Sequence, residues 1–402
     1  MSAAAPERGA NVLVESKPTS LGAALHGRSN SLGVVRLVLA LLVIVDHAFP
    51  LGGFGIDPVW ELTRGQASLG LLAVGGFFAI SGYLIAKSGL SGDVLQFLWR
   101  RFLRIFPAFW VVLLLTSLVV APILWVSRDR DLASYFAIRP DAPLGYLTEN
   151  WTLHIGQYGI GEFFIDSTPY GEAVNRSVMN GSLWTLAYEW SCYLLIGVLM
   201  MFGVLVRARI LVPIITGLLI LLQLAELVEP QAVQTIFPML AGEYRVSLTL
   251  TFMVGACLAL YSRSIPFDDR LGLLSALVLL GSLRLGGFAI VGVVAGAYFV
   301  IYLGARLPAS LQWIGSRNDY SYGIYIYGFL VQQVTAYLGW YRWGYVPYVL
   351  IAVLLTCGFA WLSWHGIEKR AMALKSWGPG RGLGFWLDRF RLARSRPRTP
   401  LT

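Results

Sequence analysis

The segment SLGVVRLVLALLVIVDHAFPLGG, residues 31–53, decides the fold class, because it is an apolar run about long enough to cross a bilayer. Similar runs recur along the chain. Of the 402 residues, 56% are hydrophobic and only 13% are charged, against about 25% charged in an ordinary soluble domain. This composition excludes a soluble globular enzyme, a disordered chain and a disulfide scaffold. It predicts an all-α polytopic integral membrane protein.

Apolar length predicts about ten transmembrane helices, of which the seventh and eighth are short and nearly continuous. Their expected bounds are 31–50, 67–88, 104–126, 182–205, 209–228, 246–262, 270–285, 287–305, 319–339 and 346–366. No repeat with a period of 20–50 residues is evident. We therefore expect one membrane domain over residues 31–366, preceded by an N-terminal segment 1–30 and followed by a basic tail 367–402.

The distribution of Lys and Arg orients these helices, because cytoplasmic loops carry an excess of positive charge. Basic residues precede the first span, follow the tenth, and lie in every second connection between them. The tail after His365 alone contains nine Lys/Arg and two acids. We therefore expect both termini in the cytoplasm and the long loop 127–181 outside, in a multi-pass protein of the cytoplasmic (inner) membrane. Topology and anionic lipid account for the net charge of +9, so no nucleic-acid partner is expected.

Motifs for metal or nucleotide chemistry are absent from the sequence. The three cysteines, Cys192, Cys257 and Cys357, lie far apart in apolar runs and give no metal-ligand spacing. There is no Walker-type loop, no HExxH and no GxSxG. No metal cofactor is expected.

The first span carries ionisable residues, which are costly within a membrane and mark functional sites. Arg36 and His47 are eleven residues apart, which places them within about 20° on one helix face and about 16 Å apart along it. Arg36 is thus expected near the cytoplasmic end and His47 near the outer end. A structural hydrogen bond is one interpretation of His47, and proton transfer near neutral pH is the other. Arg36 could equally extend its charged end to the inner interface.

Two further groups of charged residues lie in or beside spans. Glu189 lies about 10 Å into the fourth span, where a carboxylate could orient and charge-stabilise an imidazole such as His47. A structural ion pair or a protonated Glu is the alternative. Arg101 and Arg104 are three residues apart, on one face of a helix start. Two neighbouring guanidiniums suit a phosphorylated ligand, although an ordinary cytoplasmic basic cluster would look the same.

Taken in order, five motifs resemble the membrane-bound acyltransferase family 3, which is typified by bacterial O-antigen and polysaccharide O-acetyltransferases. Together the motifs run in family order over about residues 30–370. They are the Arg36–His47 pair, GGFFAISGYLI at 75–85, RRFLRIFPAFW at 100–110, SLWTLAYEWSCYLL at 182–195 and SYGIYIYGFLV at 321–331.

The resemblance implies an enzyme that works across the membrane. Its members take an acyl group from cytoplasmic acyl-CoA, usually acetyl-CoA, and donate it to a hydroxyl of a glycan or glycolipid outside. By resemblance, His47 is catalytic and Glu189 is the glutamate of the fourth-span motif. Arg101 and Arg104 correspond to the pair that the family uses for the CoA donor, and Arg36 lines the donor path.

The sequence departs from the family at two motifs. Tyr327-Gly328 stands where many members have a histidine, and Trp190-Ser191-Cys192 follows Glu189 where the motif often continues with an acid or Gln. No appended esterase domain is expected after the tenth span. The loop 127–181 is expected to help choose the acceptor, with Trp151, Tyr158 and Tyr170 available to stack on sugars. The alternative function is a proton-coupled transporter or flippase for a lipid-linked glycan, but the inverted repeats typical of transporters are not visible. A non-catalytic scaffold would leave the costly ionisable residues unexplained.

Overall fold

The computed structural model describes most of the chain, namely residues 19–25, 27, 30–91, 93–137, 140–237 and 244–378. Within these residues the regular structure is helical, apart from one isolated bridge between Ser20 and Pro266. This confirms the all-α prediction. The predicted segments 1–30 and 367–402 fall largely outside the described residues, as does His26.

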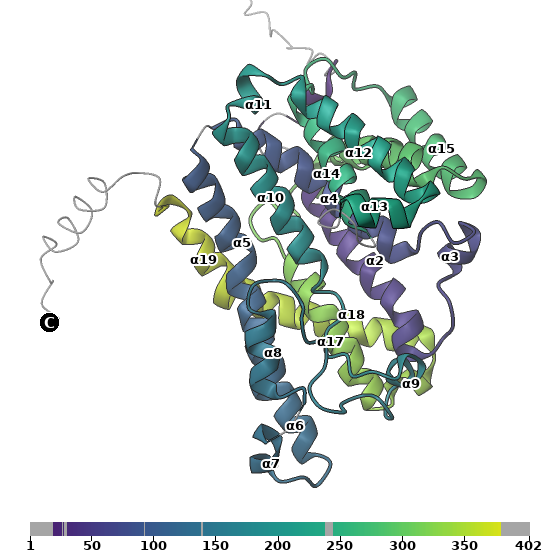
Figure 1. Ribbon diagram of the computed structural model, residues 1–402, viewed down its shortest axis with the longest axis vertical. Helices are drawn as coiled ribbons and strands as arrows, with labels where there is room; N and C mark the ends of the chain where they lie inside the picture. The colour runs from purple at the N-terminus through teal and green to yellow at the C-terminus, as the bar shows by residue number, and fades with distance from the viewer. Residues whose placement is uncertain are drawn as a thin grey trace, which may run out of the picture.

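The helical segments follow one another along the chain as a single body (Figure 1), with α-helices labelled α and π- or 3₁₀-segments labelled η. In chain order they are α1 (Leu21–Ala24), α2 (Leu32–Gly52), α3 (Pro58–Leu62), α4 (Leu69–Gly89), α5 (Val94–Leu115), η1 (Thr116–Val120), α6 (Ala121–Val126), α7 (Leu132–Phe136), α8 (Pro143–Asn150), α9 (Pro169–Val174), α10 (Thr185–Met201), α11 (Val204–Arg207), α12 (Leu211–Val228), α13 (Pro230–Ile236), α14 (Arg245–Leu260), α15 (Asp269–Leu285), η2 (Phe288–Gly292), α16 (Val293–Arg306), η3 (Ala309–Leu311), α17 (Ser321–Tyr337), η4 (Trp340–Trp343), α18 (Tyr345–Ser363), η5 (Trp364–Glu368), α19 (Lys369–Ala373) and η6 (Leu374–Ser376).

Each predicted apolar run contains a helix, and in the described part of the chain six helical stretches are long and apolar enough to cross a membrane. These are Leu32–Gly52, Leu69–Gly89, Val94–Val126, Leu211–Val228, Phe288–Arg306 and Tyr345–Ser376. The helices α10 and α14 are apolar but shorter. The chain is therefore a multi-helix membrane protein, while the count of ten spans and the orientation of the termini stay predictions.

Helix α5 begins ten residues before the expected start at 104. The carboxylate of Asp93 caps it, accepting a hydrogen bond from the Gln96 amide at 2.9 Å. Apolar length missed this first part of α5 because it contains Arg100, Arg101 and Arg104. A helix tolerates such charges where they face other helices or a cavity, and not lipid.

Helix α4 lies at the centre of the packing, with α14, α2, α16 and α10 around it. Its closest neighbour is α14. A Cβ added at Gly82 would lie 1.9 Å from the carbonyl oxygen of Phe252, and one at Gly255 would lie 2.2 Å from that of Ala79. Two glycines therefore let the two backbones touch, as small residues do between membrane helices.

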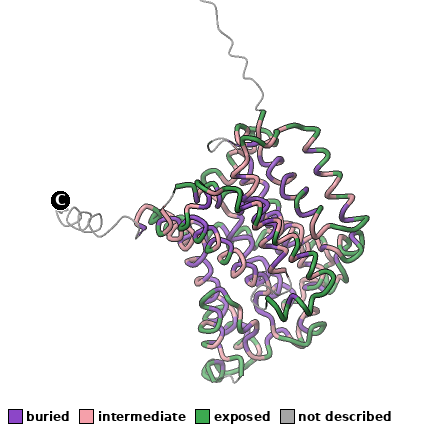
Figure 2. Tube along the Cα trace, turned by 45° about the horizontal axis from the view of Figure 1, so that its top comes forward, coloured by how far each residue is buried: buried purple, intermediate pink, exposed green. Residues whose placement is uncertain are grey.

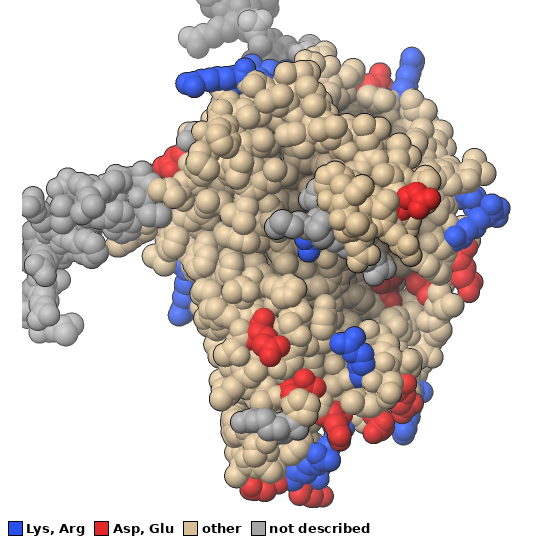
Figure 3. Space-filling view, viewed as in Figure 1, with Lys and Arg blue, Asp and Glu red and all other residues tan. Residues whose placement is uncertain are grey.

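The outer surfaces are apolar and the charged residues lie toward the ends. Buried residues follow the inner helices, and exposed positions follow the outer ones (Figure 2). Large exposed side chains on α12, α15 and α18 include Leu218, Leu277 and Leu354, as expected for helices that face lipid. On the face shown in Figure 3, charged side chains gather toward the lower end, which Figure 1 identifies as the segment containing α7, α8 and α9.

Substitution of Gly82 by Ala should loosen the α4–α14 contact, because the new methyl group meets backbone that has no room to move. We expect a loss of about 1–3 kcal/mol of stability, measured as a lower unfolding temperature of the purified protein. Gly217→Ala is the matched control, since nothing lies within 4 Å of a Cβ there. Equal unfolding temperatures for the two variants would contradict the close packing.

Candidate active site

A cavity of about 530 Å³ opens between α2, α4, α5, α10, α17 and α19. It contains four of the five residues predicted for the site: Arg36, Arg101, Arg104 and Glu189. Three other cationic side chains line it, Arg317, Lys369 and Lys375. Segments that are far apart in the sequence therefore converge on one hollow.

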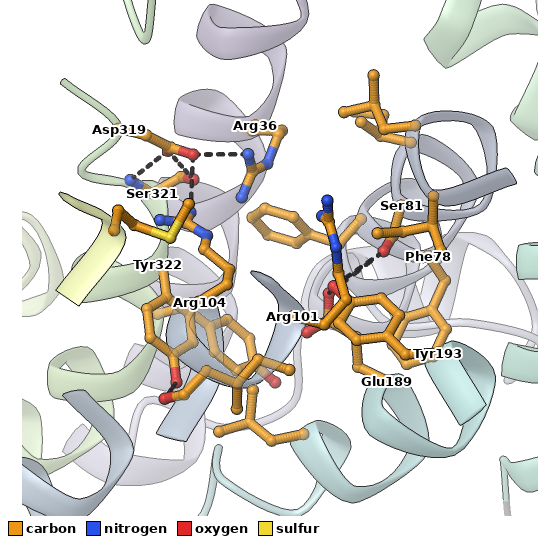
Figure 4. A pocket seen from close by; sticks show the side chains of 18 of the residues that line it. Arg36, Phe78, Ser81, Arg101, Arg104, Glu189, Tyr193, Asp319, Ser321 and Tyr322 are labelled. Carbon is orange, nitrogen blue, oxygen red and sulfur yellow. Dashed lines mark hydrogen bonds and ion pairs between the residues drawn. The ribbon is translucent and has the colours of Figure 1, made fainter. Parts of the chain in front are cut away.

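Asp319, just before α17, is the point at which two of these arginines meet (Figure 4). One of its carboxylate oxygens accepts from Arg36 at 2.6 Å and from Arg104 at 2.7 Å. The other accepts from the Ser321 hydroxyl at 2.6 Å and from the Ser321 amide at 3.2 Å. One carboxylate therefore connects α2, α5 and the start of α17.

Arg104 has a second acidic partner, Glu368, at 3.4 Å. Glu368 is buried, and the Ser363 hydroxyl donates to it at 2.9 Å. It belongs to η5, a π-helical turn after α18. Such turns re-aim side chains within a helix and are frequent at functional sites. The two acids leave Arg104 fully paired.

The opposite side of the cavity holds a separate polar group, formed by Arg101, Glu189, Ser81 and Tyr193 (Figure 4). The Glu189 carboxylate accepts hydrogen bonds from the hydroxyls of Ser81, at 3.3 Å, and Tyr193. Arg101 makes one long hydrogen bond, to the Ser88 hydroxyl at 3.4 Å. The buried Nε of Arg101 has no partner among the described residues. Arg101 is thus the least satisfied of the three predicted arginines.

His47 does not line this cavity. Its ring lies edge-on to Phe329 of α17, with centroids 5.3 Å apart. No hydrogen bond or ion pair joins His47 to Glu189 within the residues that the structure describes, so these two predicted residues are not brought together. Tyr325, which does line the cavity, stands one helical turn before Phe329. The cavity therefore ends about 6 Å short of the His47 level along α17.

Tyr325 and Phe77 form the inner wall between the cavity and His47. Their ring centroids are 6.0 Å apart. The Tyr325 hydroxyl lies 2.5 Å from that of Thr185 and donates to the Ser182 carbonyl at 2.9 Å. Phe77 also packs against the cluster that contains Ile44 of α2, about one turn before His47.

Two tyrosines of the loop 127–181 pack against Phe329, the residue whose ring contacts His47. The ring of Tyr170 lies 5.9 Å from that of Phe329, and Tyr158 packs against the same cluster. Burial raises the pKa of both hydroxyls, against the effect of nearby Arg176. The two side chains therefore stay neutral hydrogen-bond donors beside the His47 region.

Sequence reasoning missed Asp319, Glu368 and Tyr193. Asp319 stands at the start of an apolar run, and Glu368 stands at the start of the basic tail. An acid two residues after Arg317 and two residues before the SYGIY motif is a usable signal. No sequence signal pairs Asp319 with Arg36, because 283 residues separate them.

Substitution of Asp319 by Asn should destabilise the protein by about 3 kcal/mol, because it leaves two largely buried guanidiniums without their shared counter-ion. Thermal unfolding of the purified variant measures the loss. Asp269→Asn is the matched control, since it breaks an ion pair with Arg306 in which both side chains are more than half exposed, and it should cost at most about 1 kcal/mol. A smaller loss for Asp319→Asn than for the control would contradict the central role of Asp319.

Known proteins resemble this chain over most of its length. An O-acetyl transferase of Shigella phage Sf6 is 29% identical over 357 residues, which are 87% of this chain and 98% of that protein. Nodulation protein 10 of Rhizobium leguminosarum bv. viciae is 25% identical, covering 87% of this chain and 95% of its own. A putative peptidoglycan O-acetyltransferase of Bacillus subtilis is 24% identical over 77% of this chain but only 52% of its own length. No solved structure is significantly similar.

The family model described as "Acyltransferase domain" matches residues 29–365. This match includes Arg36, His47, Asp319 and the lining of the cavity apart from Lys369, Met372, Ala373 and Lys375. It ends three residues before Glu368. The chain therefore belongs to this acyltransferase family, as the motifs in its spans predicted, and is an acyltransferase of the membrane.

Proposed function

We propose that this protein moves an acyl group, in the first place acetyl, from cytoplasmic acyl-CoA to a hydroxyl of an extracytoplasmic polysaccharide. The observation that carries the proposal is the cation-lined cavity that ends one helical turn from His47. The names of the relatives, two O-acetyltransferases among them, favour acetyl and a carbohydrate acceptor.

The charge of the cavity favours a polyanionic donor. Six cationic side chains line it against two carboxylates, Glu189 and Asp319. Because Asp319 already neutralises part of Arg36 and Arg104, the phosphates of CoA would meet chiefly the other cations, Arg101, Arg317, Lys369 and Lys375. Lys and Arg both bind phosphate, and Arg adds a planar fork of donors. Among the described residues none of these four forms an ion pair with an acid.

This distribution refines the predicted roles of the three arginines. Arg101 is the best candidate for direct phosphate contact, since its guanidinium is the least satisfied. Arg36 and Arg104 line the path and contribute positive potential, but their hydrogen bonds hold the helices together. Glu189 lies close enough to Arg101 to interact with it electrostatically. We therefore propose Glu189 as a positioning residue for Arg101.

The acyl end of the donor must pass the Phe77–Tyr325 wall to reach His47. The pantetheine arm of CoA is thin and only mildly polar, so it suits a narrow route between helices. The distance to cover is about one helical turn. Rotation of two aromatic side chains would open the route, and no helix needs to move.

His47 is then placed to act on the acceptor hydroxyl. As general base it takes the hydroxyl proton while the oxygen attacks the thioester carbonyl. The C–S bond breaks, CoA leaves as a thiolate, and the proton passes to that sulfur. The products are an O-acyl ester and free CoA. In the alternative sequence the imidazole first carries the acyl group itself, with the same overall balance.

The acceptor would approach from the side of α9. Tyr158 and Tyr170 lie there beside Phe329, which touches His47. Aromatic rings offer flat apolar faces with a polar edge, as sugar recognition requires. The donor and acceptor would thus reach His47 from opposite sides of the membrane.

Substitution of His47 by Ala should reduce acyl transfer about 10²–10⁴-fold, the usual contribution of a general base. The measurement is the O-acyl ester content of cell-surface glycans, together with the amount of protein in the membrane. The variant should still bind acetyl-CoA, because His47 lies outside the cavity. Normal acylation by a correctly inserted His47→Ala protein would overturn the assignment.

Substitution of Arg101 by Ala should weaken acetyl-CoA binding to the purified protein about tenfold or more, since one charge-assisted phosphate contact is lost. Lys369→Ala should also weaken it. Arg263→Ala is the control, because it removes a positive charge from an exposed position away from the cavity. Equal affinities for Arg101→Ala and Arg263→Ala would exclude the cavity as the donor site.

A further inference from the structure

A second hollow lies on the other side of the α2–α4 pair, between these helices and α16. Its volume is about 380 Å³. The lining side chains are almost entirely apolar, and the hydroxyl of Thr251, one of the few polar groups, is satisfied by the Ser247 carbonyl at 2.8 Å. The hollow contains no lysine, arginine or acid, which distinguishes it from the donor cavity.

Hydrogen bonds fasten α16 at both ends of this hollow. At one end the Ser31 amide donates to the Gly304 carbonyl at 2.7 Å, just before α2 begins. At the other end the Gln66 side chain donates to the carbonyls of Ser282 and Leu283 at 3.1 and 2.7 Å, and accepts from the Phe288 amide at 3.1 Å. These hydrogen bonds fix the helical segment at two points, and between them Ala297 of α16 packs in one cluster with Ala79 of α4, along one edge of the hollow.

The residues that line the hollow on this segment give its length. From Phe288 to Leu303 the helix rises about 22 Å. The hydrocarbon core of a bilayer is about 30 Å thick, so one leaflet is about 15 Å. Val38, midway along the lining on α2, is 48% exposed, which leaves the hollow open sideways.

We propose that this hollow, the α2–α4–α16 groove, binds one hydrocarbon chain of a membrane lipid. Three helical stretches that line it, Leu32–Gly52, Leu69–Gly89 and Phe288–Arg306, are membrane spans by length and composition, so lipid hydrocarbon is the medium that meets its open side. An apolar chain of one leaflet's length fits within the groove and matches its polarity. Water would find few polar partners there. The bound chain would fill the gap between the fastened ends and hold α16 against α2.

Glycines on the floor provide a way to fill the groove without disturbing the fold. Nothing lies within 4 Å of a Cβ added at Gly75, and at Gly296 the nearest atom is a Leu279 methyl at ordinary contact distance, 3.4 Å. Gly75→Leu and Gly296→Leu should therefore occupy the space of the lipid chain. Gly358→Leu is the matched control, because its Cβ also meets open space but on the exposed face of α18.

The test is photocrosslinking of the full-length protein in vesicles that contain phosphatidylglycerol with a diazirine in one acyl chain, followed by peptide mapping. We expect crosslinks concentrated on the groove segments 34–42 and 288–303 in the wild type and in Gly358→Leu. They should fall at least fivefold in Gly75→Leu and Gly296→Leu. Crosslinks spread evenly over the exposed faces of α12 and α18, or undiminished in both filled variants, would overturn the proposal.

A second measurement covers the case in which a filled variant folds poorly. Since a ligand that binds only the native state raises its stability, added phosphatidylglycerol should raise the unfolding temperature of the wild type and of Gly358→Leu. In a filled variant that folds, added phosphatidylglycerol should leave the unfolding temperature nearly unchanged. Equal lipid-dependent shifts in all proteins would count against the groove, whatever their starting stability.

Discussion

A single carboxylate, that of Asp319, is the contact on which the cation-lined cavity depends. It joins Arg36 of α2 to Arg104 of α5 at the start of α17, and Arg104 continues to Glu368 beyond α18. Charges are costly within a membrane protein unless they are paired. The network satisfies these charges and at the same time fixes the relative positions of the helices around the hollow. On the proposed function, Asp319 and Glu368 occupy Arg36 and Arg104, so the other four cations are left for the donor.

On the proposed function, the same arrangement separates donor binding from chemistry. The cavity holds charge, and the His47 region beyond the Phe77–Tyr325 wall holds an imidazole with apolar and aromatic neighbours. A transfer across a membrane needs such a separation, because an open path would also pass water and ions. The wall consists of side chains, which are able to move without disrupting the backbone packing of α4 against α14. A static cavity that stops one turn short of His47 is thus consistent with a reaction that opens only with the donor in place.

Much of the fold could be predicted from the sequence, because the length of apolar runs and the rare ionisable residues within them are strong signals in a membrane protein. The runs at 31–50 and 67–88 became α2 and α4 within two residues at each end. Arg101, Arg104 and Glu189, chosen from motif and depth, meet in one cavity with Arg36. The prediction is weaker where charge interrupts a helix. Hydropathy alone begins the span too late at α5 and ends it too early at η5. It could not find the Asp319 network, because tertiary pairing across 283 residues leaves no trace in local spacing.

The central claim is that the acyl group enters from the cytoplasmic side and leaves on the other. Membrane vesicles of opposite orientation, each supplied externally with acetyl-CoA radiolabelled in its acetyl group, test it directly. Inside-out vesicles expose the cytoplasmic face and should transfer label to glycan enclosed within them, whereas sealed right-side-out vesicles should transfer none. Labelling that requires external acetyl-CoA on right-side-out vesicles, or that is equal in both orientations, would contradict the account.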